Sequence, residues 1–426
     1  MKGIKKMQKK RLCPIIMILN CLLILSEVYA DPFMSYPGTR AKAMGGAFCA
    51  IADDASAAWY NPAGIAGDQT FDFTFEWSNA IVQKSDSKGN LFDLSQYGID
   101  PESLSAEENK YFLSFKFSNK NNSSTERIGF SLYYISPYTI DWYFPPKSNV
   151  GEAFGTFEEN LSIYGIAVAF SALNERLKCG ATIEYVKIDF NPDNLRIVSN
   201  YQSTINYLDS VSLRSSSGHG FSSSVGIIGV LINNTKKAIK LKVGATYRAE
   251  SSCSVSAGTS SEEENDDNIS DEEEEYLYMK RDAIEKLIFN KPSSYDIGFA
   301  LSKGFHSINS GILISGQYSR TDWSKNNKTI ENKYKKTSFG AEWQIASSKR
   351  VFFSHFAFRG GWYQSESTLP KKGWPDVIGT TFGIGLLYNS YWGMDLAYED
   401  RYIYYENIDK GKNFSLFSVA VTAAWD

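Results

Sequence analysis

Long stretches of the chain alternate apolar and polar residues one by one, and this period of two restricts the fold more than any other feature. The segment 71–77 has the sequence FDFTFEW, and the segment 239–248 has the sequence IKLKVGATYR. Successive side chains of a β-strand point to opposite faces, so each stretch has one apolar face and one polar face. The alternation therefore predicts an all-β fold with one oily and one wet surface.

Fourteen segments show this pattern, and the connections between them alternate in length. The predicted strands span 70–82, 110–118, 126–136, 158–171, 177–190, 218–231, 238–250, 293–303, 310–321, 336–346, 351–364, 377–389, 391–401 and 413–425. The long connections are 83–109, 137–157, 191–217, 251–292, 322–335, 365–376 and 402–412. The short connections are 119–125, 172–176, 232–237, 304–309, 347–350 and residue 390. Long outer loops, short periplasmic turns and an even strand number are typical of a closed transmembrane antiparallel β-barrel, which exposes no sheet edge to lipid.

A soluble β-sandwich also alternates, but the aromatic residues favour the barrel. Phe, Trp and Tyr make up 15% of the chain although its mean hydropathy is negative. Tyr133-Tyr134, Trp362-Tyr363 and Tyr391-Trp392 lie near segment ends, as in the aromatic girdles of membrane barrels. Trp425, next to the end of the last predicted strand, resembles the signal that the barrel-assembly machinery recognises. That machinery and outer-membrane lipid are therefore expected partners.

The first thirty residues have the features of a cleaved secretory signal peptide. A basic start is followed by an apolar run over 15–25 and by Val28-Tyr29-Ala30, with small residues at the positions that signal peptidase recognises. Lipidation at Cys21 is the alternative, although Asn20 is an unfavourable residue before a lipidated cysteine. Without this leader the net charge falls from −4 to about −9, which excludes nucleic acid as an expected partner.

Cofactors and metals are not expected. Cys49, Cys179 and Cys253 are the three cysteines that follow the leader. Their odd number and wide spacing fit neither a disulfide framework nor a metal site.

The stretch 38–64, GTRAKAMGGAFCAIADDASAAWYNPAG, has neither strand nor helix periodicity. Its many Gly and Ala residues allow close packing of backbone on backbone. Pro62 prevents a helix from continuing and favours an extended or turn conformation at Asn61. We expect residues 31–69 to form a plug inside the barrel, entering from the periplasmic side. The alternative is an ordinary lead-in to a soluble domain.

This stretch, directly after a signal peptide, resembles the N-terminal hatch of the FadL/OmpP1/TodX family, in a form closest to spirochaetal members. Its residues GTRA, MGGAF, ADDAS and NPAG carry the resemblance. The family consists of outer-membrane transporters for long-chain fatty acids and other hydrophobic compounds. The resemblance implies a 14-stranded barrel over 70–426 with a hatch in its lumen. It also implies that a hydrophobic ligand is captured at outer loops, moves to a site beside the hatch, and leaves through a gap in the wall.

The resemblance and the sequence suggest residues for gating and for ligand binding. The gating set is Gly45, Gly46, Asp53, Asp54, Asn61, Pro62 and Ala63. Asp53 and Asp54 lack a neighbouring base or metal, so a capping or turn role is expected for them. Three- and four-residue spacing predicts a short amphipathic helix over 275–290, which either captures ligand or caps the barrel. Its ligand-facing residues are Tyr276, Met279, Ile284, Leu287 and Ile288.

Three arginines point into the lumen by the alternation, and each is a candidate partner for a ligand carboxylate. They are Arg127, Arg248 and Arg359. Arginine binds carboxylate in a bidentate manner, but lumen cations also pair with lumen acids. The acidic run over 262–275 is interpreted as a solvated loop.

No enzyme motif is present: G-x-S-x-G, H-E-x-x-H and a phosphate-binding loop are all missing, and only three histidines occur. The sequence therefore predicts a transporter and not an enzyme, although a barrel esterase has no required local motif. A barrel scaffold or adhesin that handles protein partners is the alternative function. The identity of the ligand, the position of a wall opening and the oligomeric state stay open.

Overall fold

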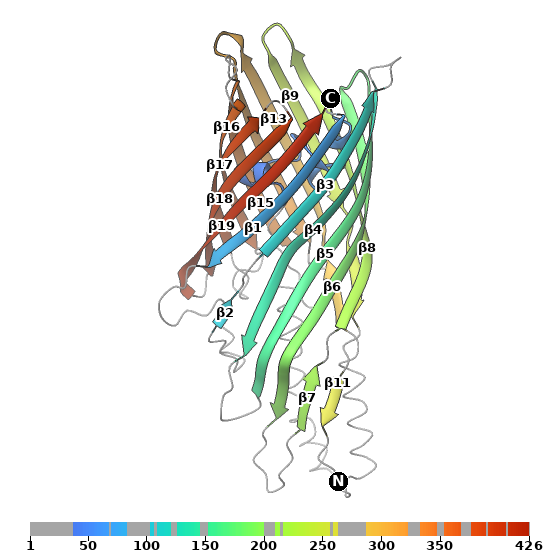
Figure 1. The fold of residues 1–426 in the computed structure, drawn as a ribbon, viewed down its shortest axis with the longest axis vertical. Helices are drawn as coiled ribbons and strands as arrows, with labels where there is room; N and C mark the ends of the chain where they lie inside the picture. Colours follow the sequence, from blue (N-terminus) through green and yellow to red (C-terminus); the bar gives the residue numbers. More distant parts are fainter. Residues whose placement is uncertain are drawn as a thin grey trace, which may run out of the picture.

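The computed structural model describes residues 37–67, 70–82, 103–105, 109–120, 126–144, 152–199, 209–213, 216–255, 259–262, 287–322, 333–346, 353–367, 376–388, 391–405 and 408–425. The leader predicted over 1–30 lies outside these residues, as does most of the acidic run. Across the described residues, no helix is both long enough and apolar enough to cross a bilayer. The fold is formed by one continuous antiparallel sheet (Figure 1).

The long strands are β1 (Phe71–Val82), β3 (Asn109–Lys120), β4 (Arg127–Phe144), β5 (Glu152–Ala172), β6 (Leu177–Ser199), β8 (Ser216–Asn234), β9 (Ile239–Arg248), β13 (Ser293–Phe305), β14 (Ser310–Asp322), β15 (Lys333–Ala346), β16 (Phe353–Ser367), β17 (Asp376–Tyr388), β18 (Trp392–Tyr405) and β19 (Ile408–Trp425). The short strands are β2 (Ser103–Ser105), β7 (Asp209–Leu213), β10 (Ser251–Val255), β11 (Thr259–Glu262) and β12 (Leu287–Lys291). The helices are α2 (Thr39–Ala43), α3 (Ala57–Tyr60), and the 3-10 turns η1 (Pro62–Ile65) and η3 (His306–Ile308).

The long strands close into a ring. Each pairs antiparallel with the next along the chain, β9 pairing with β13. The first strand, β1, completes the ring by pairing with the last, β19, in a register that runs from Phe71 opposite Trp425 to Val82 opposite Phe414. The described strands thus form the predicted fourteen-stranded barrel, in which every long strand has two neighbours.

The two faces of the barrel wall differ sharply in chemistry. Large apolar side chains lie exposed on the outer face, such as Ile183 at 66% and Phe221 at 67% of full accessibility. Polar side chains such as Ser78, Lys116 and Glu184 are buried on the inner face. This arrangement is the reverse of a soluble protein and suits a barrel surrounded by hydrocarbon. The alternation found in the sequence is confirmed.

Several boundaries differ from the prediction because the wall continues beyond the apolar band. Strands β4, β5, β6 and β8 extend through much of the loops predicted over 137–157 and 191–217 (Figure 1). The alternation of apolar and polar residues ends where the outer face is no longer apolar. The backbone hydrogen bonds between paired strands do not depend on lipid contact, so the strands continue beyond this point. Short strands also occupy parts of the loops predicted over 83–109 and 251–292.

The prediction of a helix over 275–290 is wrong at the C-terminal end of that range. Leu287–Lys291 form strand β12, which pairs with β10. Pairing with β10 gives this backbone inter-strand hydrogen bonds at alternate residues, whereas an isolated helix of this length is marginal in water. Residues 275–286 lie outside the described residues.

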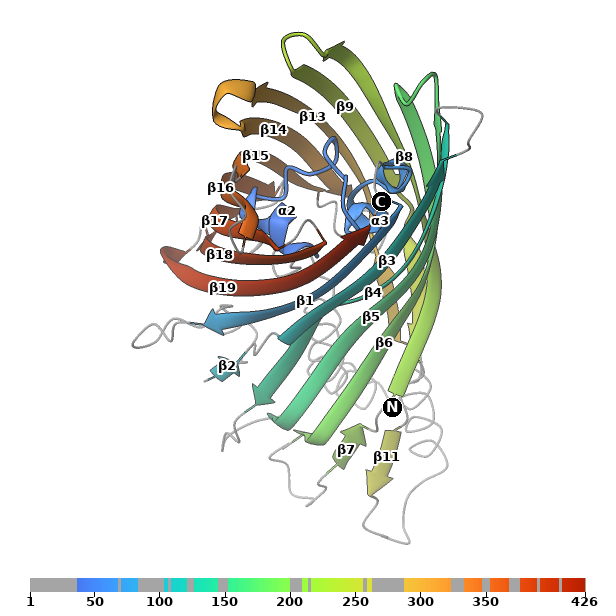
Figure 2. The same ribbon diagram turned by 45° about the horizontal axis from the view of Figure 1, so that its top comes forward.

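Residues 37–67, called the lumen segment below, lie inside the ring of strands (Figure 2). Met44, Phe48 and Trp59 are among its buried side chains. After α2 the chain turns sharply through Gly45 and Gly46, whose φ angles are +66° and +79°. Only glycine adopts such angles without strain. The described part of the range 31–69, for which the sequence predicts a plug, therefore lies within the barrel.

Candidate functional site

Side chains of the wall bind the backbone of the lumen segment. The Gln317 Oε1 atom accepts hydrogen bonds from Phe48 N at 3.0 Å and from Cys49 N at 2.8 Å. Thr381 Oγ1 accepts from Gly45 N at 3.0 Å and lies 2.9 Å from Ala43 O, to which it donates. Further wall donors reach backbone oxygens of the segment, namely Ser114 to Ala55, Lys116 to Asp53, Ser118 to Gly67, Thr182 to Ala58 and Thr246 to Tyr60. The lumen segment has little regular structure, and these bonds satisfy backbone groups that would otherwise be buried without partners.

Glycines on the inner face let this backbone pack directly against the strands. A Cβ atom added at Gly340 would lie 2.5 Å from Met44 O, and one at Gly244 would lie 2.6 Å from Cys49 O. Added Cβ atoms at other wall glycines would also meet the segment, namely at Gly129, Gly180, Gly226, Gly361 and Gly383. These glycines lie on strands around the barrel, so the segment is held at backbone distance on several sides.

A chain of ion pairs joins the lumen segment to the wall. Arg40 Nε donates to Glu342 Oε2 at 2.8 Å, and Arg40 Nη1 donates to Asp53 Oδ1 at 2.6 Å. Glu342 Oε2 also accepts from Arg359 Nε at 2.6 Å, and Arg359 Nη1 lies 2.5 Å from Asp395 Oδ1. The Glu342 carboxylate is buried between two guanidinium groups, so its charge is compensated by both.

Lys42 connects the segment to the closing strands. Its amino group forms a buried ion pair with Glu76 on β1 and donates to Ser418 Oγ on β19 at 3.2 Å. Ser78 and Ser418 hydrogen bond to each other at 2.9 Å across the same strand pair. Lys42 therefore bridges the first and last strands of the barrel.

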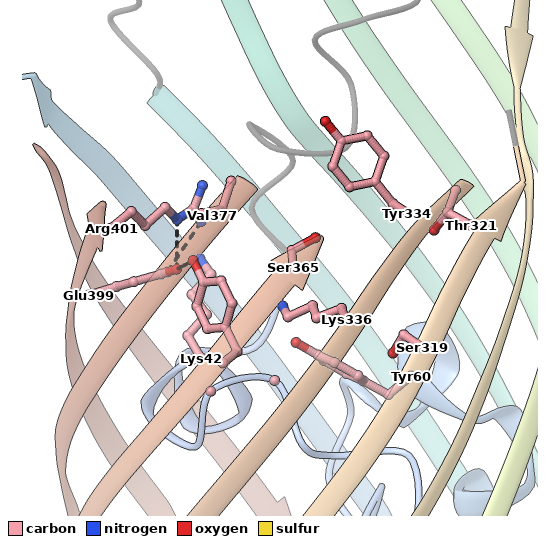
Figure 3. A pocket seen from close by; sticks show the side chains of 13 residues that line it. Lys42, Tyr60, Ser319, Thr321, Tyr334, Lys336, Ser365, Val377, Glu399 and Arg401 are labelled. Carbon is pink, nitrogen blue, oxygen red and sulfur yellow. Dashed lines mark hydrogen bonds and ion pairs between the residues drawn. The ribbon is translucent and has the colours of Figure 1, made fainter. Parts of the chain in front are cut away.

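Above the segment, polar residues of α2 and strands β14 to β18 line a small cavity (Figure 3). Its lining consists of Lys42, Gly45, Gly46, Tyr60, Ser319, Thr321, Tyr334, Lys336, Tyr363, Ser365, Val377, Glu399 and Arg401. Tyr363 Oη and Arg401 Nε each donate to Glu399 Oε1 at 2.6 Å. The Lys336 ammonium lies 4.1 Å from the centre of the Tyr363 ring. The cavity volume is about 40 Å³, which suits a polar group and not an acyl chain.

Known structures share this architecture. No protein-family model matches the sequence, and no curated protein matches it either. The CymD monoaromatic hydrocarbon channel aligns with 12% identity and a TM-score of 0.59, over 91% of this chain and 97% of CymD. A Pseudomonas aeruginosa FadL homologue aligns with 12% identity and a TM-score of 0.57, over 92% of this chain and all of the homologue.

The Pseudomonas putida toluene transporter TodX aligns with 12% identity and a TM-score of 0.52, over 92% of this chain and 98% of TodX. The chain has the FadL-type fold. This FadL-type barrel, with its apolar outer face, belongs in a membrane. The likeness expected from the N-terminal motifs is thus confirmed at the level of the fold.

The residues predicted from the sequence to act in gating all belong to the lumen segment of the FadL-type barrel. Asn61 has extended backbone angles (φ −158°, ψ 104°), as expected before Pro62. Its Nδ2 atom donates to Cys49 O at 2.9 Å and to Ile227 O on β8 at 3.1 Å. Its Oδ1 atom accepts from Ala63 N at 3.2 Å. One side chain thus ties the Asn61–Ala63 turn to both the segment and the wall.

The paired aspartates have separate local roles. Asp53 binds Arg40 and is 44% exposed at its side chain. Asp54 Oδ1 accepts from Ser56 N at 2.9 Å and from Ser56 Oγ at 2.5 Å, which is the predicted turn role. Gly45 and Gly46 line the polar cavity.

Protein groups bind the three arginines proposed for a ligand carboxylate. Arg127 Nε pairs with Glu175 Oε1 at 2.9 Å, in the turn between β5 and β6. Arg248 donates to Trp59 O and lies over the Trp59 ring at 4.6 Å. Arg359 belongs to the ion-pair chain with Glu342. The structure brings Arg248 and Arg359 against the lumen segment or its anchors and leaves Arg127 at a turn.

The structure does not place the other residues that are predicted to bind ligand in this site. Tyr276, Met279 and Ile284 lie outside the described residues, and the backbones of Leu287 and Ile288 belong to β12.

The cavity residues Lys336, Tyr363 and Arg401 were missed. Tyr363 was assigned to an aromatic girdle, but it faces the lumen and is 5% exposed. Tyr133 likewise faces inward and donates to Glu184 Oε1 at 2.6 Å. A period of two sends only one member of an adjacent aromatic pair towards lipid, and this signal was available in the sequence.

Proposed function

We propose that this protein takes up long-chain fatty acids or similar hydrophobic compounds across the outer membrane, with the lumen segment acting as a movable hatch. The single observation that carries the proposal is the way the segment fills the barrel. Its backbone contacts wall glycines on several strands and is hydrogen bonded to wall side chains. A solute that enters the lumen must therefore displace part of the segment. The toluene transporter TodX and the monoaromatic hydrocarbon channel CymD, which share the fold, support a hydrophobic cargo.

The contacts of the segment suit a reversible movement. Part of its attachment consists of hydrogen bonds and ion pairs to wall side chains, which water or ligand groups can replace one at a time. A ligand shifts the docked and undocked populations only when it binds one of them more tightly. The polar cavity can supply such a difference, because Lys336 and the Glu399–Arg401 pair line it together with Gly45 and Gly46 of the segment. A ligand head group that binds there competes with contacts that keep the segment seated.

Uptake is tested with protein reconstituted in liposomes and radiolabelled oleate or toluene added outside. A barrel of unrelated fold serves as the control. We expect transfer of at least one labelled compound into the liposomes above the control. Equal transfer for both proteins refutes the transport function. The scaffold alternative is tested by purifying the protein from detergent extracts, and a partner protein that co-purifies in fixed ratio favours it.

The hatch is tested separately by deleting residues 37–67 and recording ion conductance in a planar bilayer. The intact protein is expected to conduct weakly, whereas the deletion variant is expected to form a steady open pore. Equal conductance of the two folded proteins shows that the segment does not block the lumen.

A further inference from the structure

Two cations face each other on the outer surface of the barrel. Arg320 on β14 is directly opposite Lys335 on β15 in the strand register. The alternation places both on the outer face that carries Tyr318 and Phe339, which are 37% and 49% exposed. Like charges directly opposite each other destabilise a strand pair. An anion between the two cations would remove this repulsion.

The position along the strands is the boundary of the lipid layer. Tyr295 and Tyr318 have ring centroids 6.3 Å apart, and Tyr247 is opposite Tyr295 in the register. A row of tyrosines on the outer face marks the level of the membrane interface. Arg320 is opposite Tyr295 and lies two residues beyond Tyr318, away from the short turn at η3. Its guanidinium therefore emerges at the level of lipid head groups on the long-loop side.

Neighbouring acids form no ion pair with these two cations. Asp322 is paired with Lys333 at 3.9 Å. Glu366 is opposite Lys335 on β16 and keeps its negative charge, but its Oε1 atom is bound by the neutral Gln364 Nε2 at 2.8 Å. Among the described residues, no carboxylate lies within 4.0 Å of Arg320 or Lys335. Three cations, Arg320, Lys333 and Lys335, face two acids, Asp322 and Glu366, so the patch keeps one net positive charge in a chain whose net charge is −4.

We propose that Arg320 and Lys335 form a binding site for the phosphate of an anionic lipid in the outer leaflet. The guanidinium fork matches the two charged oxygens of a lipid phosphodiester, and the ammonium shares one of them. Below the site, the outer face carries Phe299, Ile314 and Phe339, all exposed, which supply an apolar surface for the acyl chains. A free phosphate ion gains nothing from that surface, so the geometry favours a lipid over an inorganic anion.

The test measures lipid binding to the purified barrel by native mass spectrometry. Phosphatidylglycerol is the anionic probe, phosphatidylcholine the zwitterionic control, and inorganic phosphate the competitor. The variant is Arg320→Gln/Lys335→Gln. The matched control is Lys236→Gln/Lys237→Gln, which removes two exposed cations from the turn between β8 and β9. Heat-modifiable migration on gels confirms that each variant folds, and Arg320→Lys/Lys335→Arg tests retention of charge.

Each cation near a membrane surface contributes enough to predict about a 30-fold loss of phosphatidylglycerol affinity in the double variant. The turn control is expected to bind like the wild type, and the charge-retaining variant is expected to keep most of its affinity. Unchanged phosphatidylglycerol binding in the Gln variant overturns the proposal. Displacement of the lipid by millimolar inorganic phosphate also overturns it, because the site then recognises a free anion. None of these results depends on transport or on the hatch.

Discussion

Replacing Gly340 by alanine tests whether close packing seats the lumen segment. The added Cβ atom would lie 2.5 Å from Met44 O and 2.7 Å from Met44 Cβ. Ordinary contacts of this kind begin near 3.4 Å, so the segment or the wall must move by about 1 Å. The wall is hydrogen bonded to both neighbouring strands, and the segment is therefore the part that yields. Overpacking of this type costs about 1–3 kcal/mol.

That cost lowers the ratio of docked to undocked segment by roughly 5- to 150-fold. The thiol of Cys49 reports the change, because it is fully buried beneath the segment's contacts with Gln317 and Thr246. Burial also raises the pKa of Cys49 to about 12, so the docked thiol is protonated and unreactive. The assay is the rate of maleimide labelling of Cys49 in a background in which Cys179 and Cys253 are replaced by serine.

The neighbouring strand provides a matched control. In Gly360→Ala the nearest atom to the added Cβ is Thr381 O at 3.9 Å, an ordinary contact. We expect Gly340→Ala to speed Cys49 labelling by at least five-fold and Gly360→Ala to leave the rate within two-fold of the parent. Equal rates for the two variants refute the idea that wall glycines seat the segment.

Three further predictions concern the anchors of the segment and its response to ligand. Oleate at saturating concentration is expected to accelerate the labelling of Cys49. If no hydrophobic compound that is tested changes the labelling rate, ligand binding and hatch movement are not coupled. Asn61→Ala removes the donor to Cys49 O and Ile227 O; leaving these groups unpaired costs about 1–3 kcal/mol, and the same labelling assay should show an increase of about five-fold or more. Lys42→Met leaves the buried Glu76 carboxylate without its cation, so the midpoint of urea unfolding in detergent should fall, and Lys42→Met/Glu76→Gln should recover part of the loss. A double variant no more stable than the single variant contradicts the buried ion pair.

The parts of the fold that could be predicted from the sequence are the strand segments whose outer face contacts lipid. Hydrocarbon imposes an apolar residue at every second position, and the strand β1 shows this in residues 71–77. Beyond the lipid boundary that constraint ends, which explains why the outward extensions of β4 to β6 were missed. Their pairing is set by backbone hydrogen bonds, and these leave no period-two signal in side-chain polarity.

The lumen was less predictable because its residues respond to one another and not to a uniform solvent. The turn at Asn61-Pro62 was predictable because proline restricts the residue before it. The partners of Arg248 and Arg359 were not, since Trp59 and Glu342 are distant in sequence. Lys336 and Arg401 carry no local motif at all. Only the strand register brings them to one cavity.

The bridge from Lys42 to both closing strands has a consequence for the order of assembly. Lys42 lies 376 positions before Ser418 in the chain, so their hydrogen bond forms only after β19 has been synthesised and has joined β1. A segment made first is thus the last to reach its final seat. The N-terminal region therefore reaches its final contacts only in a barrel whose first and last strands have paired.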